Sequence, residues 1–281
     1  MSTVQLLIID PQNDFMDIPG AALPVQGALA DMARLATVID GAAERIAGIT
    51  VTLDSHHSVG IERPAMWQRA DGAPVAPFTQ ISADQVRAGE YRPRRSQDLE
   101  RVLAYLDALE AGGRYQLMVW PVHCEAGTWG HNVEQGLRLA YNRWEARTLQ
   151  PVRKIFKGMN AWTENYSALQ AEVPDPQDPD TQLNTALIAA LDAGGQIVVA
   201  GEASSHCVRA TCEHLADHLP SGRVDKLVLL ADCMSPVGGF EAQAQAFLAA
   251  MRARGATVTT SADYPRAALN IALLAGQDEL R

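Results

Sequence analysis

The sequence predicts an α/β protein built on a doubly wound, mostly parallel six-stranded sheet with helices on both faces. Short apolar runs rich in valine, isoleucine and leucine alternate along the chain with longer amphipathic stretches. Continuous apolar strands that alternate with helices are typical of a parallel sheet buried on both faces. A second observation agrees with this class. Acidic, imidazole and thiol side chains directly follow the apolar runs, and open α/β sheets bind ligands beyond the carboxyl ends of their strands.

The expected elements follow one another regularly along the chain. The strand candidates are residues 4–9, 49–53, 117–120, 153–155, 196–200, 226–230 and 257–259. The main helix candidates are residues 28–47, 183–193, 206–218 and 240–254. No internal repeat or low-complexity linker divides the chain, so we expect a single domain over residues 1–281.

Residues 67–115 depart from this alternation and are expected to form an insertion. A charged amphipathic stretch over residues 98–110 predicts a helix of its own. Its apolar positions are Leu99, Val102, Leu103, Tyr105 and Leu106. We expect a structural or oligomeric role for this insertion, and a lid over the functional site is the alternative.

Composition and charge exclude several classes of function. A formal net charge of −10 argues against nucleic acid and acidic membrane surfaces as partners. No apolar run reaches the roughly 20 residues of a membrane-spanning helix, and the first residues lack the basic segment of a signal peptide. Four cysteines in 281 residues do not form a disulfide framework. We therefore expect a cytoplasmic protein, a homo-oligomer, that acts on a small molecule.

Cys207 is the candidate nucleophile. It follows the strand at 196–200 and opens the helix at 206–218. The unpaired N–H groups and positive dipole of a helix N-terminus favour a thiolate over a thiol. A hydrolase uses such a cysteine as its nucleophile, and a buried structural cysteine is the alternative. The residues that accompany Cys207 elsewhere in the chain favour catalysis.

Two further groups are placed to assist this thiol. Asp10 directly follows the first strand, and it is either a turn-forming residue or the general base that accepts the thiol proton. Lys157 follows the strand at 153–155 and offers a cation that stabilises a thiolate. Lysines are usually solvated, so this role depends on the residues around it.

A metal site is predicted from Asp54, His56 and His123. The Asp-x-His pair ends the second strand, and His123 follows the apolar run at 117–120. These residues offer one oxygen and two nitrogen ligands and leave coordination positions open for water or substrate. The expected ion is divalent, with zinc favoured and iron or manganese as alternatives.

Taken together, these segments resemble the cysteine hydrolase (isochorismatase-like) superfamily, and within it the nicotinamidase branch. The matching segments are residues 9–15 (IDPQNDF), 20–24 (GAALP), 54–56 (DSH), 120–124 (WPVHC) with 127–128 (GT), 157–158 (KG) with 166–168 (YSA), and 201–207 (GEASSHC). Their order fits throughout, and the insertion at 67–115 is not covered. The combination is specific, although each motif alone is not.

The resemblance implies a role for each matching residue. Cys207 corresponds to the nucleophile, Asp10 to the aspartate that takes its proton, and Lys157 to the lysine of the triad. Glu202-Ala203 falls where the family has a cis peptide, so that the Ala203 N–H joins that of Cys207 in an oxyanion hole. Asp54, His56 and His123 correspond to metal ligands. The aromatic walls of the nicotinamide pocket correspond to Phe15 and Trp120.

Three departures from the family pattern bear on substrate and metal. Ser204-Ser205 stand where the family often has Thr-Asp, and the extra histidine usual after the Asp-x-His pair is missing, with Gly60 and Glu62 nearby. His57, beside His56, is expected to point elsewhere. The resemblance implies hydrolysis of nicotinamide to nicotinate and ammonia. The alternatives are an amidase of another small amide or ureide, or a non-catalytic binding protein with this fold.

Overall fold

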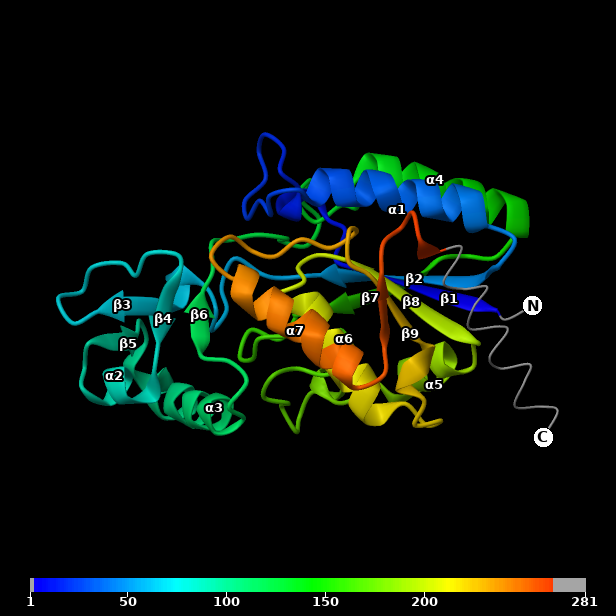
Figure 1. Ribbon diagram of the computed structural model, residues 1–281. Coiled ribbons are helices and arrows are strands. Elements are labelled where there is room, and N and C mark those ends of the chain that lie inside the picture. Colours follow the sequence, from blue (N-terminus) through cyan, green and yellow to red (C-terminus); the bar gives the residue numbers. More distant parts are fainter. Residues whose placement is uncertain (1–2, 265–281) are drawn as a thin grey trace.

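The computed structural model describes residues 3–264, and a six-stranded parallel sheet lies at its centre (Figure 1). The strand order is β10-β9-β8-β1-β2-β7, and every neighbouring pair is parallel. The strands are β1 (Val4–Ile9), β2 (Ile46–Asp54), β7 (Arg153–Lys157), β8 (Gln196–Gly201), β9 (Leu227–Leu230) and β10 (Thr257–Thr259). Within this sheet, chain order runs outward in both directions from β1 and β8, which makes the gap between their carboxyl ends a topological switch point. The predicted fold class is confirmed.

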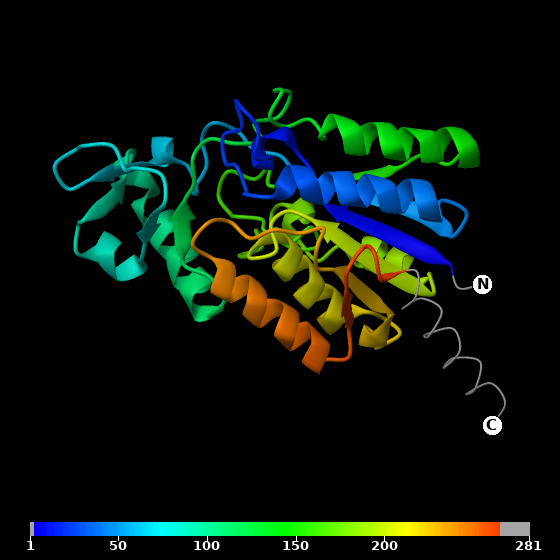
Figure 2. The same ribbon diagram turned by 45° about the horizontal axis from the view of Figure 1, so that its top comes forward.

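Helices cover both faces of the sheet (Figures 1 and 2). One face carries α1 (Ala28–Ala42) and α4 (Gln135–Thr148), which pack side by side. The other carries α5 (Thr185–Asp192), α6 (Cys207–His218) and α7 (Glu241–Ala253). Short 3-10 helices are η1 (Asn13–Phe15), η2 (Pro64–Met66), η3 (Ser96–Asp98), η4 (Pro179–Thr181) and η5 (Val224–Lys226). Among residues 3–264, no helix is long and apolar enough to cross a membrane.

Several element boundaries differ from the sequence prediction, among them the start of β2 at Ile46 rather than residue 49, and two helix boundaries have a clear local cause. The helix expected over 28–47 ends at Ala42, because a turn closed by the Arg45 N–H and the Ala42 carbonyl leads directly into β2 at Ile46. The helix expected from residue 183 begins at Thr185. Asn184 caps it, since its side chain accepts a hydrogen bond from the Leu187 N–H.

The expected strand at 117–120 does not belong to the central sheet. β6 (Leu117–Val119) pairs antiparallel with β4 (Thr79–Ile81) from the insertion, with Ile81 opposite Leu117. An apolar run predicts a buried strand but carries no information about its partner, and here the insertion supplies it. A second antiparallel pair joins β3 (Trp67–Arg69) to β5 (Tyr91–Pro93). The insertion also contains α2 (Ala83–Arg87) and the predicted helix, α3 (Leu99–Ala111).

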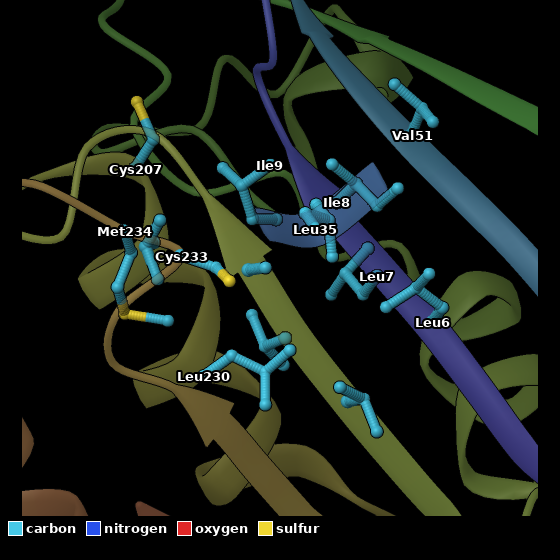
Figure 3. Packing of buried hydrophobic residues seen from close by; sticks show 14 of the residues in the cluster. Leu6, Leu7, Ile8, Ile9, Leu35, Val51, Cys207, Leu230, Cys233 and Met234 are labelled. Carbon is cyan, nitrogen blue, oxygen red and sulfur yellow. The ribbon is translucent and has the colours of Figure 1, made fainter. Parts of the chain in front are cut away.

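The buried apolar side chains form two clusters. The larger one fills the space between the sheet and its helices, and Figure 3 shows the part around β1, with Leu6, Leu7, Ile8, Ile9, Leu35, Val51 and Leu230. The smaller one lies in the insertion and the segments that flank it, and includes Ile61, Trp67, Ile81, Leu106 and Leu117. The insertion therefore has its own core, and it lies beyond the carboxyl ends of the parallel strands (Figures 1 and 2). The single-domain and homo-oligomer assignments stay predictions.

Candidate active site

Sheet register brings the predicted catalytic residues together at the switch point. Ile9 at the end of β1 is opposite Gly201 at the end of β8, so Asp10 and the loop that leads to Cys207 emerge side by side. On the other side of β1, Asp54 of β2 is opposite Lys157 of β7. Asp10, Asp54, Lys157 and Cys207 are all buried.

Lys157 is the centre of this cluster. Its Nζ lies 3.0 Å from Asp10 Oδ2, 2.8 Å from Asp54 Oδ1 and 3.6 Å from Cys207 Sγ. It also donates to the Asn165 carbonyl at 2.8 Å. A lysine surrounded by two carboxylates, a carbonyl and a thiol is fixed in place rather than solvated, as the catalytic interpretation of the sequence requires.

Two residues of this cluster have no signal in the sequence. The Thr52 hydroxyl donates to Asp10 Oδ1 at 2.5 Å and accepts from the Asp10 N–H at 3.0 Å. These bonds hold Asp10 in a left-handed backbone conformation, with φ of 43°. Asn165 contributes only a backbone carbonyl. Both positions depend on the tertiary fold, and no motif predicts them.

Burial shifts the pKa values of Cys207 and Asp10, whereas neighbouring charges set that of Lys157. Burial raises the pKa of the Cys207 thiol well above its usual range, and Lys157 only partly opposes this effect. Burial also raises the pKa of Asp10, again against the lowering effect of Lys157. For Lys157 itself burial lowers the pKa, but Asp10 and Asp54 outweigh it and hold the pKa well above the usual value.

These directions correct one expectation from the sequence. The helix N-terminus was expected to favour a thiolate, but burial raises the pKa of the Cys207 thiol well above its usual value, which favours the neutral thiol. A buried thiol needs a base close by, and burial makes the Asp10 carboxylate more basic than an exposed one.

Two backbone N–H groups beside the Cys207 thiol, those of Ala203 and of Cys207 itself, are free to bind an oxyanion. Within the described residues, no backbone or side-chain acceptor bonds the N–H groups of Ala203 and Cys207. The Glu202–Ala203 peptide is cis, as the resemblance implies. Gly201 precedes it with φ of 117°, and a Cβ at this position would lie 2.0 Å from the Ile9 carbonyl oxygen. Only glycine allows the loop to pass this close to β1.

The three predicted metal ligands converge on one point. Asp54 Oδ2 lies 2.8 Å from His56 Nε2 and 3.2 Å from His123 Nε2, and all three side chains are buried. Metal–ligand bonds of about 2.1 Å place neighbouring ligand atoms roughly 3.0–3.4 Å apart, so this spacing suits one divalent ion. Gly158 follows Lys157 with φ of 88°, and a Cβ there would lie 2.8 Å from His56 Cε1.

The outer ring nitrogens also fit a metal site. His56 Nδ1 faces Glu62 Oε1 at 3.3 Å, and His123 Nδ1 lies 2.8 Å from the Pro121 carbonyl. Such partners orient a ligating imidazole and leave Nε2 free for the ion. Arg63 Nη1, which can only donate, also lies 2.9 Å from His123 Nδ1. If a metal were bound at Nε2, the neutral ring would carry its proton on Nδ1 and would donate it to the Pro121 carbonyl. His57 is exposed, as expected.

Aromatic side chains line the same region. Phe15 and Trp120, the predicted walls, are buried, and the Phe15 ring centroid lies 5.4 Å from that of His123. Trp120 donates through Nε1 to the Tyr166 hydroxyl at 3.0 Å, and its ring centroid lies 5.2 Å from that of His206. Tyr166 belongs to a motif noted in the sequence, whereas the position of His206 against Trp120 emerges only in the structure.

The insertion reaches this aromatic cluster. Phe78 packs edge-on against Trp120 with ring centroids 5.8 Å apart, and its N–H donates to the Val119 carbonyl at 2.6 Å. Its side chain is 55% exposed, so it lies at the outer edge of the cluster. No feature of the sequence predicts this contact.

Comparison with solved structures places the fold. Acinetobacter baumanii nicotinamidase/pyrazinamidase is similar with a TM-score of 0.63 at 19% identity, over 94% of this chain and 99% of that one. The chain has the fold of the isochorismatase-like hydrolases. No protein-family model and no curated protein sequence matches it.

Two further structures share this fold. Yeast nicotinamidase bound to the inhibitor nicotinaldehyde has a TM-score of 0.61 at 18% identity, over 92% of this chain and all of that one. The Pyrococcus horikoshii pyrazinamidase in complex with zinc has a TM-score of 0.53 at 19% identity, over 92% and 98% of the two chains. The likeness extends over nearly the whole length of each protein.

Proposed function

We propose that the protein is a metal-dependent amidohydrolase that uses an Asp10-Lys157-Cys207 triad, with nicotinamide as the first candidate substrate. One observation carries this proposal. Lys157 Nζ lies 3.0 Å from the Asp10 carboxylate and 3.6 Å from the Cys207 thiol, at the switch point of the sheet. A base, a cation and a thiol in contact form an activated nucleophile.

The chemistry follows from these positions. Asp10 takes the thiol proton as Cys207 Sγ attacks the amide carbonyl carbon. Lys157 stabilises the negative charge, which lies on the Asp10 carboxylate before this step and develops on the Cys207 sulfur during it. The N–H groups of Ala203 and Cys207 hold the resulting oxyanion. Asp10 then gives its proton to the leaving nitrogen, and ammonia departs from a thioester. Water, deprotonated by Asp10, hydrolyses the thioester to the acid and restores the thiol.

The metal would be held by Asp54, His56 and His123. When bound, it supplies a Lewis acid that orients a ring nitrogen of the substrate or a water molecule. The donor set suits zinc, iron or manganese, and the zinc-bound pyrazinamidase with the same fold favours zinc. Asp54 has a second task here, because its Oδ1 accepts from Lys157.

The aromatic walls support a flat heteroaromatic carboxamide as substrate. Phe15 and Trp120 provide apolar surface, and His123 next to Phe15 brings the metal site close to that surface. Structures of the same fold belong to a nicotinamidase and to pyrazinamidases. Phe78 from the insertion packs against Trp120 at the edge of this aromatic surface, so an amidase for a different small amide or ureide is the alternative.

Ammonia release from a panel of amides tests the proposal. We expect nicotinamide and pyrazinamide to give a higher kcat/KM than several aliphatic amides and a ureide. If the kcat/KM for an aliphatic amide or a ureide is a hundredfold higher than that for nicotinamide, the nicotinamidase assignment is wrong and the amidase assignment stands. No release from any amide by metal-loaded protein would contradict both.

A further inference from the structure

Glu202 is a buried carboxyl group directly beside the oxyanion donors, and the proposed reaction does not use it. Its side chain is fully buried. Its peptide unit carries the Ala203 N–H, so any contact that fixes Glu202 also fixes the direction of that donor. A role for Glu202 in orienting this donor presupposes the proposed amidase reaction.

Hydrogen bonds on two sides hold the residues that flank this peptide unit. The Glu202 N–H donates to the Ile9 carbonyl at 2.8 Å, which ties it to the end of β1. Glu202 Oε2 accepts from the Ser235 N–H at 3.0 Å. The Ser204 N–H donates to the Ser235 carbonyl at 2.9 Å, so Ser235 contacts the residues on both sides of Ala203.

Ser235 also joins Glu202 to a second buried carboxyl group. Its hydroxyl donates to Asp31 Oδ2 at 2.6 Å. Asp31 lies in the first turn of α1, is buried, and also accepts from the Arg34 guanidinium through Oδ1. Asp31 is therefore an anchored acceptor next to Glu202.

One buried atom in this cluster has no partner when both carboxyl groups are ionised. Glu202 Oε1 is completely enclosed, and no donor reaches it within the described part of the chain. A buried polar atom without a partner costs about 1–3 kcal/mol. A proton on Oε1 makes it a donor, and the Asp31 side chain, which lies within hydrogen-bonding reach of the Glu202 carboxyl group, is the acceptor that removes this cost.

The charged surroundings of Glu202 favour that proton. Burial raises the pKa of Glu202 well above its usual range, the Asp31 carboxylate raises it further, and the Ser235 N–H partly opposes them. Asp17 adds a smaller effect in the same direction as Asp31. Arg34, the nearest cation on α1, is committed to Asp31 and to the Asp232 carbonyl.

We propose that Glu202 is a positioning residue for the oxyanion hole. As a protonated carboxyl group it donates from Oε1 to Asp31 and accepts at Oε2 from Ser235. These two bonds fix the peptide unit that carries the Ala203 N–H and connect it to α1. Glu202 does not touch the substrate, and it acts only through Ala203.

Two substitutions separate this role from simple packing. In Glu202→Gln the amide group still donates to Asp31 and accepts from Ser235, so we expect kcat within about threefold of wild type. Glu202→Met keeps the length and loses both bonds. We expect it to lower kcat about 10–100-fold with KM nearly unchanged, below the roughly 10²–10³-fold cost of losing an oxyanion donor. Glu100→Gln, an exposed carboxyl on α3, is the control.

A second measurement does not depend on turnover. Infrared difference spectra of wild type minus Glu202→Gln at neutral pH should show the carbonyl band of a protonated carboxyl group that shifts in D2O. Iodoacetamide should alkylate Cys207 at the same rate in wild type and Glu202→Met, because alkylation needs no oxyanion hole. An absent infrared band, equal loss of kcat in both variants, or full kcat in Glu202→Met would overturn the inference.

Nicotinaldehyde binding separates failure of this inference from failure of the proposed function. The Cys207 sulfur adds to the carbonyl carbon of nicotinaldehyde, and the thiol proton passes through Asp10 to the carbonyl oxygen, which gives a hemithioacetal. The former carbonyl oxygen then lies at the proposed oxyanion site. If wild type hydrolyses no amide, the proposed function is wrong. Weaker nicotinaldehyde binding in Glu202→Met, but not in Glu202→Gln, would still support this role for Glu202. Equal binding by all three proteins would overturn it.

Discussion

Asp54 and Lys157 face each other across neighbouring parallel strands, and their side chains join the proposed triad to the proposed metal site. Lys157 Nζ donates to Asp54 Oδ1 at 2.8 Å, while Asp54 Oδ2 lies 2.8 Å from His56 Nε2. One carboxylate therefore contacts both Lys157 and His56, one of the two candidate histidine ligands. Substitution of Asp54 should affect both, whereas substitution of a histidine ligand should affect the metal alone.

His123→Ala is expected to remove the metal and leave the triad intact. Wild-type protein purified without added metal should contain near one equivalent of divalent ion per chain by elemental analysis, and His123→Ala should contain little. Iodoacetamide should still alkylate Cys207 in this variant. Because the extra loop histidine is missing, we also expect wild type to release its metal to a chelator readily.

His57→Ala is the matched control, since His57 is exposed and is not one of the three candidate ligands. Its metal content should equal that of wild type. Metal-free wild type with full activity after chelation would contradict a functional metal site.

The burial of Asp10 should determine the pH at which kcat/KM declines on the acidic side of its pH profile. Only the ionised carboxylate accepts the thiol proton, and burial raises the pKa of Asp10. As pH falls, kcat/KM should therefore begin to decline at a higher pH than an exposed aspartate, with its pKa near 3.9, would give. Asp10→Asn should lose activity at every pH. A residual pH-dependent activity in Asp10→Asn would show that another group is the base.

Glu172 should make stability depend on pH. Burial raises its pKa from 4.5 to about 7, and its Oε1 has no hydrogen-bond partner in the described residues. The folded state binds this proton more tightly than the unfolded state, so the free energy of unfolding falls as pH rises from about 4.5 to 7. The loss is up to about 3 kcal/mol for a shift of this size.

Glu172→Gln removes this titration. Its melting temperature should exceed that of wild type at pH 8 and be similar to it at pH 5, as measured by calorimetry. Glu100→Gln, with an exposed carboxyl group, should show no such difference. A melting temperature difference that is the same at both pH values would show that Glu172 does not titrate in this range.

Phe78, which lies in the insertion, should contribute to the affinity for an aromatic substrate. Its ring packs against Trp120, and such an aromatic pair contributes about 0.5–1.5 kcal/mol. Phe78→Ala is expected to raise KM for an aromatic amide roughly 2–10-fold with kcat little changed. Leu149→Ala, an exposed apolar residue at the end of α4, is the control. Unchanged KM in Phe78→Ala would place the substrate away from this edge.

Most of the sheet could be predicted from the sequence, because a parallel sheet leaves a strong local signal. The apolar runs at 6–9 in β1, 197–200 in β8 and 227–230 in β9 are continuous, and an acidic residue (Asp10, Glu202 or Asp232) follows each run within two positions. The same rule placed Asp10 and Cys207 at the switch point. It misplaced β6, because burial of a run says nothing about which strand pairs with it.

The parts of the site that could not be predicted depend on three-dimensional burial and contact. The helix-start position of Cys207 suggests a thiolate, yet enclosure by the fold raises the pKa of the thiol. Thr52 lies inside a strand, and Phe78 lies in an insertion outside every motif. Their roles appear only when β1 is placed beside β2 and β4 beside β6.

Amide hydrolysis by Cys207→Ala tests the central claim most directly. The measurement is steady-state ammonia release from nicotinamide by wild type, Cys207→Ala and Cys212→Ala, a control on the same helix. The account predicts turnover by wild type and Cys212→Ala, and none above background by a folded Cys207→Ala. More than a few per cent of wild-type kcat in Cys207→Ala would contradict it.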